Sequence, residues 1–289
     1  MRPDGLKTKI FLDSGDQAET KEIMDLLGFV DGQTTNPSLF AKNPDVRAKL
    51  ATGEKFSKDE IFSVYRQIVT DISTQIPNGS VSVEVYADAN TGAEEILRQA
   101  REMNTWIPNA HIKLPITKSG LEVAEILVKE GIRVNMTLAF SQNQAAAVYA
   151  ATRGAVRGQV FLSPFVGRLD DRGEDGMSFI KNVIEMFHAG DHHVEVLSAS
   201  VRTYAHLLRC LQLESDIVTA PGKILKEWSA NDFYIPASDW KYDAGALRPL
   251  PYEEVGLNKD WREYDIHHDL TDAGLEKFAG DWNGLSRNT

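Results

Sequence analysis

Apolar and polar residues alternate in short runs along this chain, and each run precedes a longer stretch in which apolar residues recur at helical spacing. Alternation with a period of two predicts a strand, and recurrence every three to four residues predicts an amphipathic helix. Strands are predicted at residues 7–13, 28–34, 81–85, 111–115, 132–138, 159–165, 193–199 and 216–219. Helices are predicted at residues 17–27, 57–76, 91–103, 118–130, 141–153, 176–189 and 202–213, with a further helix beginning at Pro221.

Eight strand-then-helix units in succession predict an α/β fold with parallel strands, and the closed form of that arrangement is a (β/α)8 TIM barrel. A doubly wound open sheet is the alternative. No Gly-x-Gly-x-x-Gly motif follows the first predicted strand, and the chain has no Walker lysine motif. A nucleotide-binding version of the open sheet therefore has no support.

The pattern changes at residue 231. Aromatic residues and prolines are frequent from there on, with little periodicity, until a final helix predicted at about residues 272–282. A segment this short would form only a marginal core by itself. We therefore expect a single domain, residues 1–289, in which residues 231–289 form an aromatic-rich C-terminal covering segment that could overhang the mouth of the barrel.

Charge and cysteine content narrow the class of protein further. The chain has 289 residues and a net charge of −11, which argues against non-specific binding to nucleic acid or to anionic membranes. No run approaches the ~18 apolar residues of a membrane span, and the first residues lack the apolar region of a signal peptide. Cys210 is the only cysteine, so no intrachain disulfide can form. We expect a cytoplasmic protein without nucleic-acid or membrane partners, either monomeric or homo-oligomeric.

The candidate chemistry centres on Lys113, which interrupts the apolar run at residues 111–115. Side chains alternate faces along a strand, so Ile112 and Leu114 point one way and Lys113 points the other. On the inner face of a barrel a lysine is shielded from water, and burial lowers the pKa of an amine, which makes it a nucleophile. The alternative is a lysine at a strand end that extends to solvent.

The same alternation places other polar side chains on the inner face near strand ends, where active sites of this fold are built. Two carboxylates could transfer protons, and amides and hydroxyls could orient a polyol or a water. Two arginines with neighbouring serines could bind a phosphate. The inward set is Asp13, Glu84, Asn135, Thr137, Ser163 and Phe165, and the phosphate candidates are Arg168, Ser200 and Arg202.

Several of these stretches together resemble transaldolase, a Schiff-base-forming aldolase family on a (β/α)8 barrel that also includes fructose-6-phosphate aldolase. The most specific are Thr-Thr-Asn-Pro-Ser at residues 34–38 and Ser-Pro-Phe-Val-Gly-Arg at residues 163–168. Residues 11–13, 111–115, 135–138 and 199–202 also match, and all occur in the family's order. The match is looser over residues 231–289.

The resemblance implies a role for each site residue. Lys113 forms the Schiff base with a ketose phosphate, and Asp13 takes the proton from the substrate hydroxyl as the carbon–carbon bond breaks. Glu84, with Thr137 and an ordered water, shuttles protons. Asn36 and Asn135 hold the dihydroxyacetone unit, and no metal or cofactor is implied. The expected phosphate ligands are Ser163, Arg168, Ser200 and Arg202.

The implied reaction belongs to the pentose phosphate pathway. A dihydroxyacetone unit passes from sedoheptulose 7-phosphate or fructose 6-phosphate to glyceraldehyde 3-phosphate or erythrose 4-phosphate. The alternatives are an aldolase that releases free dihydroxyacetone and a non-catalytic sugar-phosphate-binding barrel. The aldolase branch of the family carries glutamine and tyrosine where this chain has Glu84 and Phe165. Both residues favour transaldolase.

Three weaker signals are interpreted structurally. The acidic residues 170–175 lack EF-hand spacing and are expected to form a solvated loop leading into a helix. The adjacent histidines at 192–193 and 267–268 point in different directions on regular structure, so we expect surface positions or helix capping. Cys210 lies in a predicted amphipathic helix, which favours core packing.

Overall fold

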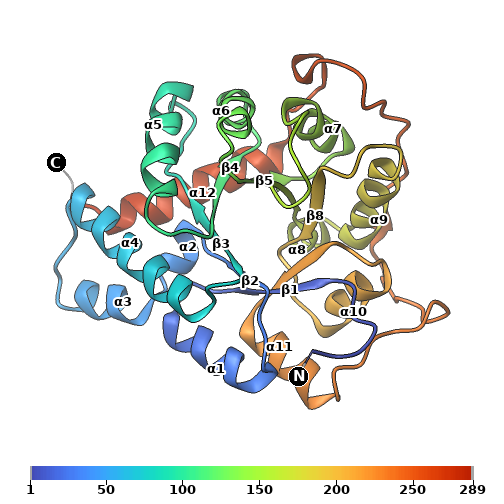
Figure 1. Ribbon diagram of the computed structural model, residues 1–289, viewed down its shortest axis with the longest axis horizontal. Helices are drawn as coiled ribbons and strands as arrows, with labels where there is room; N and C mark the ends of the chain where they lie inside the picture. Colours follow the sequence, from blue (N-terminus) through green and yellow to red (C-terminus); the bar gives the residue numbers. More distant parts are fainter. Residues whose placement is uncertain (1, 288–289) are drawn as a thin grey trace.

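Within residues 2–287, which the computed structural model describes, eight parallel strands close into a barrel surrounded by helices (Figure 1). The strands follow one another around the barrel in chain order, and the predicted (β/α)8 fold is confirmed. The barrel strands are β1 (Lys9–Asp13), β2 (Gly32–Thr34), β3 (Ser80–Glu84), β4 (Ala110–Pro115), β5 (Val134–Ala139), β6 (Val160–Pro164), β8 (Val194–Ser198) and β9 (Ile217–Ala220).

Most of the helices begin where a side chain accepts from a free backbone N–H group of the first turn, whereas α5, α8 and α11 have no such side-chain cap. Ser57 and Glu60 form a capping box at the start of α4, and Gly28 ends α1 in the left-handed conformation. The helices are α1 (Gln17–Leu27), α2 (Pro37–Phe40), α3 (Pro44–Ala51), α4 (Lys58–Gln75), α5 (Ala93–Asn104), α6 (Lys118–Lys129), α7 (Gln142–Ala151), α8 (Val166–Asp170), α9 (Gly176–Phe187), α10 (Tyr204–Gln212), α11 (Gly222–Ala230), the 3-10 turn η1 (Trp261–Glu263) and α12 (Asp269–Leu285).

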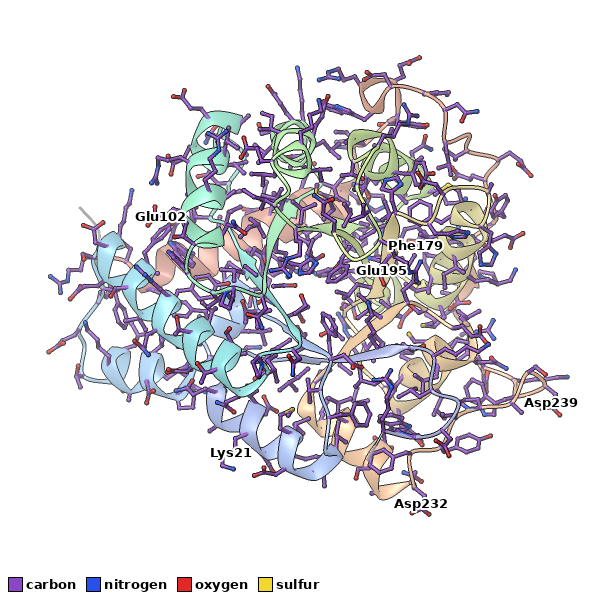
Figure 2. All side chains as sticks on the ribbon, viewed as in Figure 1. Lys21, Glu102, Phe179, Glu195, Asp232 and Asp239 are labelled. Atoms are coloured by element: carbon purple, nitrogen blue, oxygen red, sulfur yellow. The ribbon has the colours of Figure 1, made fainter. Side chains whose placement is uncertain are left out.

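Apolar side chains fill the space between the strands and the surrounding helices. Ile112 and Leu114 on β4 have no exposed surface, nor do Val81 and Val83 on β3. Burial of this kind is the main stabilising contribution to such a fold. Figure 2 shows charged side chains such as Lys21 projecting at the periphery, whereas Glu195 of β8 lies toward the centre and is buried.

The C-terminal segment ends in helix α12, which runs across one end of the barrel and packs against α2 and β5 (Figure 1). Near its end, the Trp282 ring lies 5.7 Å from the ring of Phe40 and 5.8 Å from that of Tyr65, measured between centroids. Thr271 in the first turn donates to the carbonyl of Leu138, 2.9 Å away. Helix α12 is therefore fixed at both ends to the side of the barrel where the strands end.

Several elements differ from the prediction. The final helix is longer than predicted at both ends, and the strand predicted at residues 28–34 is confined to β2. The short helices α2, α3 and α8 were not predicted, because four to eight residues show too little periodicity. Asn36 and Asn43 cap α2 and α3, each followed by a proline in the first turn.

The acidic residues 170–175 are more ordered than a solvated loop. Asp175 is buried and caps α9, and Glu174 lies in the short strand β7 (Glu174–Asp175), which pairs with β10 (Arg248–Pro249). Among residues 2–287, no group of acidic, histidine or cysteine side chains is arranged to hold a metal ion. The same residues contain no helix that is both long and apolar enough to cross a membrane.

One histidine is misplaced by the sequence prediction. His193 is buried, not at the surface, and its Nε2 lies 3.1 Å from the Thr152 hydroxyl. His268 does cap a helix, because its Nδ1 accepts from the Leu270 N–H at the start of α12. Cys210 is fully buried in α10, as core packing requires.

Candidate active site

Lys113 lies inside the barrel, with only 4% of its side chain exposed. It sits on β4, and Glu84 occupies the paired position on β3. Paired residues on neighbouring strands point to the same face, so the two side chains meet within the barrel. Lys113 Nζ lies 2.9 Å from Glu84 Oε2 and 3.3 Å from the Thr35 carbonyl oxygen, to which it donates.

The Glu84 carboxyl is as buried as the lysine, also with 4% of its side chain exposed. Burial raises its pKa, while the charges of Lys113 and Arg168 act in the opposite direction. Glu84 Oε2 forms an ion pair with Lys113 but has no well-aligned hydrogen bond among the described residues. A buried carboxyl beside a buried amine can exchange a proton with it without help from bulk solvent.

Tyr65 of α4 holds Glu84 and Thr35, the two residues that contact Lys113 Nζ. The Glu84 N–H donates to Tyr65 Oη at 2.9 Å. Thr35 Oγ1 donates its own hydrogen to the Ser82 carbonyl at 2.7 Å, so Tyr65 Oη, 2.6 Å away, must donate to Thr35. Because the Thr35 carbonyl also accepts from Lys113, the phenol connects both members of the Lys113–Glu84 pair.

Asp13 ends β1 and lines the same cavity as Lys113. Its Oδ1 accepts from the Thr34 hydroxyl at 2.7 Å, and the Thr34 hydroxyl lies 2.6 Å from that of Thr219. Burial raises the pKa of Asp13, and the Thr34 hydrogen bond and the charges of Lys113 and Lys42 oppose that shift. The site thus holds a second carboxyl suited to accept a proton.

The cavity at the strand ends has a volume of about 200 Å³. That is enough for a few carbon and oxygen atoms of a polyol, with polar groups converging on it. Its lining combines carboxylate, amide and hydroxyl groups with cations and two aromatic rings. The lining residues are Asp13, Thr34, Asn36, Ser38, Leu39, Lys42, Lys113, Ser163, Phe165, Arg168, Ala199, Ser200, Thr219 and Phe278.

A hydrogen-bonded row crosses the interior below this cavity. Ser163 Oγ donates to Asn135 Oδ1 at 2.7 Å, and Asn135 Nδ2 donates to Ser82 Oγ at 3.0 Å. Thr137 pairs with Ser163 across β5 and β6 and is fully buried, but its hydroxyl has no partner among the described residues. A buried hydroxyl without a partner is unfavourable unless a ligand or a water occupies the adjacent space.

Arg168 and Ser200 also line the cavity. Arg168 is on α8, and the pKa of its guanidinium is lowered by burial and by the Arg202 charge. Ser200 follows β8 with a φ of 57°, a left-handed conformation that is uncommon for serine. The Ser200 carbonyl accepts from the Gly167 N–H at 3.0 Å, which ties this turn to the start of α8.

Arg202 does not line the cavity and is paired with an acidic residue at the end of α8. Its guanidinium forms a two-pronged ion pair with Asp171, with Nη2 and Oδ2 2.8 Å apart. Its side chain lies over Gly167, where a Cβ atom would overlap it. Of the other predicted residues, Glu84, Asn135 and Thr137 do not line the cavity, but each lies beside a residue that does.

Seven lining residues were not assigned to the site from the sequence: Thr34, Ser38, Leu39, Lys42, Ala199, Thr219 and Phe278. Lys42 follows the unpredicted helix α2, so no pattern connected it with the strand ends. Phe278 falls within the predicted final helix, but the spacing of apolar residues does not show that this helix covers Lys113. Its ring centroid lies 5.7 Å from Lys113 Nζ.

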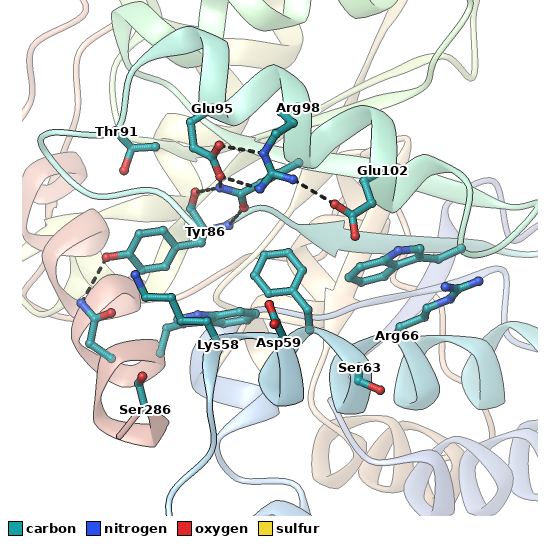
Figure 3. Close-up of a pocket in the computed structure, with 15 residues that line it drawn as sticks. Lys58, Asp59, Ser63, Arg66, Tyr86, Thr91, Glu95, Arg98, Glu102 and Ser286 are labelled. Carbon is teal, nitrogen blue, oxygen red and sulfur yellow. Dashed lines mark hydrogen bonds and ion pairs between the residues drawn. The ribbon is translucent and has the colours of Figure 1, made fainter. Parts of the chain in front are cut away.

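A larger cleft, of about 660 Å³, lies outside the barrel between α4, α5 and the end of α12 (Figure 3). Its walls carry Lys58, Arg66 and Arg98, with Glu95 and Glu102 bonded to Arg98. None of the predicted site residues lines it. We place the candidate active site in the smaller cavity, because Lys113 and Asp13 line it and Glu84 pairs with Lys113 beside it.

Comparisons with known proteins identify relatives over almost the whole chain. Residues 10–289 match the family model described as Transaldolase/Fructose-6-phosphate aldolase. The chain is 34% identical over 279 residues to a protein of Dehalococcoides mccartyi named "Probable transaldolase", covering 96% of this chain and 100% of the relative. A protein of the same name from Methanococcus maripaludis is 35% identical, over 95% of this chain and 97% of its own.

Another relative named "Probable transaldolase", from Brucella ovis, is 36% identical over 95% of this chain and 96% of its own. Among solved structures, an enolase of the mandelate racemase subgroup from Agrobacterium tumefaciens superposes with a TM-score of 0.47 at 11% identity. That superposition covers 79% of this chain and 58% of the enolase.

Proposed function

The chain belongs to the transaldolase/fructose-6-phosphate aldolase family, and on that premise we propose that it is a transaldolase acting through a Schiff base on Lys113. The observation that carries this proposal is the buried Lys113–Glu84 pair, 2.9 Å apart, beside a cavity that Asp13 also lines. The substrates would be sedoheptulose 7-phosphate or fructose 6-phosphate as donor, with glyceraldehyde 3-phosphate or erythrose 4-phosphate as acceptor.

In the first half of the reaction the Lys113 amine attacks the ketose carbonyl. Forming the imine requires a proton for the departing hydroxyl, and Glu84 is close enough to supply it. The Thr137 hydroxyl, which has no protein partner, would position a water that relays protons between Glu84 and the substrate. The product is a protonated imine that can accept electrons.

Carbon–carbon cleavage then requires a base at the substrate hydroxyl. Asp13 takes the hydroxyl proton, the adjacent carbon–carbon bond breaks, and its electron pair moves into the imine to give an enamine. The aldose phosphate leaves and the second aldose phosphate enters. The enamine carbon attacks its aldehyde, Asp13 returns the proton, and hydrolysis of the new imine frees Lys113.

The remaining polar groups would orient the substrate. Asn36 uses its Oδ1 to cap α2, so its Nδ2 is available to a hydroxyl in the cavity. Asn135 and Ser163 form the hydrogen-bonded row at the other side of the dihydroxyacetone unit. Arg168 and Ser200 would bind the phosphate, joined by Arg202 if the anion draws it from Asp171.

An assay with and without acceptor tests the proposal against the aldolase alternative. With fructose 6-phosphate and erythrose 4-phosphate, we expect sedoheptulose 7-phosphate to accumulate. With fructose 6-phosphate alone, we expect little free dihydroxyacetone. Acceptor-independent release of dihydroxyacetone at the same rate would establish the aldolase instead. Binding of sugar phosphate without either product would indicate the non-catalytic barrel.

A further inference from the structure

Helix α12 carries two residues, one turn apart on the same face, that contact Arg168. The Phe278 ring centroid lies 5.5 Å from Arg168 Cζ, and the ring centroid of Phe165, which precedes α8, lies 5.6 Å from it. Four residues before Phe278, Gly274 is buried against the same guanidinium. Residues four apart on a helix lie one above the other, so Gly274 and Phe278 form one continuous contact surface for Arg168.

Gly274 is the residue that leaves room for the guanidinium. A Cβ atom on Gly274 would lie 2.7 Å from Arg168 Nη1 and 2.6 Å from Leu138 Cδ2. Both atoms are ends of flexible side chains, so an added methyl group would displace those side chains more readily than the backbone. Gly280 and Gly284 of the same helix have no atom within 4 Å of such a Cβ.

Glycine within a helix is unfavourable relative to alanine, so its presence at a buried contact has to be compensated. The contact it permits is with a cation that has no carboxylate partner. Arg168 lines the cavity, donates no hydrogen bond and forms no ion pair within residues 2–287. Two aromatic rings hold it in place instead, with its donors left for an anion in the cavity.

We propose that Gly274 is a positioning residue. Together with Phe278 it fixes the position of the Arg168 guanidinium in the cavity, and thereby the affinity for the phosphate of the sugar phosphate. This inference rests on the proposed function in one respect, namely that the anion bound by Arg168 is the substrate's phosphate. The C-terminal helix is then part of the specificity for phosphorylated over unphosphorylated sugars, although it contributes no ligand of its own to the phosphate.

The test compares Gly274→Ala with Gly280→Ala, the same change on the exposed side of the same helix. The affinity for inorganic phosphate is measured by calorimetry, and KM and kcat are measured with glyceraldehyde 3-phosphate and with unphosphorylated glyceraldehyde as acceptors. Loss of one charge-assisted hydrogen bond predicts roughly a tenfold or greater rise in the phosphate Kd and in KM for glyceraldehyde 3-phosphate. We expect unchanged kcat at saturation, unchanged KM for glyceraldehyde, and wild-type values throughout for Gly280→Ala.

A phosphate Kd of Gly274→Ala equal to that of Gly280→Ala would overturn the proposal. So would an equal rise in KM for both acceptors, or a wild-type protein that does not bind phosphate. If Gly274→Ala does not fold, as judged by its melting temperature, Phe278→Leu replaces it, with a several-fold rise in phosphate Kd expected from the lost ring. Failure of the proposed function would be seen separately, as absent turnover in a wild-type protein that still binds phosphate.

Discussion

Lys113 and Glu84 face each other from paired positions on neighbouring strands, with Nζ and Oε2 2.9 Å apart and both side chains almost fully buried. Little of either group is exposed to bulk water. In the proposed mechanism, protons that leave the amine or reach the departing hydroxyl would therefore pass through this pair or through a water held beside it. The predictions below separate the roles of the groups around it.

Replacing Glu84 with glutamine should slow formation of the Schiff base. The amide keeps the shape of the side chain but cannot exchange a proton, and general acid–base catalysis of this kind contributes roughly 10²- to 10⁴-fold. We expect a loss of that size in the rate at which borohydride traps the enzyme with fructose 6-phosphate. Glu195→Gln is the matched control, because Glu195 is also buried but pairs with Lys9 near the start of β8. Equal trapping rates in Glu84→Gln and Glu195→Gln would show that Glu84 takes no part in imine formation.

Asp13→Asn should stop the reaction one step later. Asparagine cannot take the hydroxyl proton, so the carbon–carbon bond should stay intact while the imine still forms. We expect trapping of an intact six-carbon adduct by mass spectrometry, with turnover reduced at least 10²-fold. A three-carbon adduct formed at the wild-type rate would show that another group acts as the base.

Activity should fall on the acidic side of the pH–rate profile with a midpoint above pH 3.8, the ordinary pKa of aspartate, because burial raises the pKa of Asp13. Asp13 acts as a base only when ionised, so activity is lost as the pH falls through its raised pKa. Lys42→Gln removes a cation that lowers this pKa, so the acidic limb should move to higher pH, more so at low salt. Lys129→Gln, an exposed change on α6, should leave the limb in place. A shift toward lower pH in Lys42→Gln would contradict the assignment.

Tyr65→Phe should reduce kcat with little change in KM. Without the hydroxyl, the Glu84 N–H and Thr35 Oγ1 lose their shared partner, and the backbone of the two residues that contact Lys113 Nζ is less firmly held. We expect a loss of stability of about 1–3 kcal/mol in denaturant unfolding. Tyr149→Phe is the control, since its hydroxyl bonds to Asp191 away from the site. Tyr149→Phe should lose comparable stability and keep the wild-type kcat. An equal loss of kcat in Tyr65→Phe and Tyr149→Phe would show that the loss follows from lower stability and not from the position of Tyr65.

The periodicity of the sequence was sufficient to predict the barrel and the inner face of its strands. Alternation placed Lys113 and Glu84 on the same face, and closure of a parallel sheet then brings them together. Asp13, Ser163 and Phe165 line the cavity for the same reason. These are local patterns with a fixed period, so a single sequence contains them.

What the sequence did not predict depends on contacts between distant segments. Phe278 reaches Lys113 only because α12 folds back across the barrel, and nothing in the spacing of an apolar helix face specifies which surface it covers. Arg202 stays a predicted phosphate ligand, but the sequence did not indicate its pairing with Asp171, a residue of the acidic stretch interpreted as a solvated loop. Whether an arginine pairs with an acidic side chain or stays available to a ligand depends on which residues lie near it in the folded chain.

The central claim is that Lys113 carries the covalent intermediate, and trapping followed by peptide mapping tests it most directly. The protein is incubated with fructose 6-phosphate, reduced with borohydride, digested and analysed by mass spectrometry. We predict one substrate-derived adduct, located on Lys113 and absent from Lys113→Arg. An unmodified Lys113 under conditions that trap an established transaldolase, or an adduct on another lysine, would contradict the account.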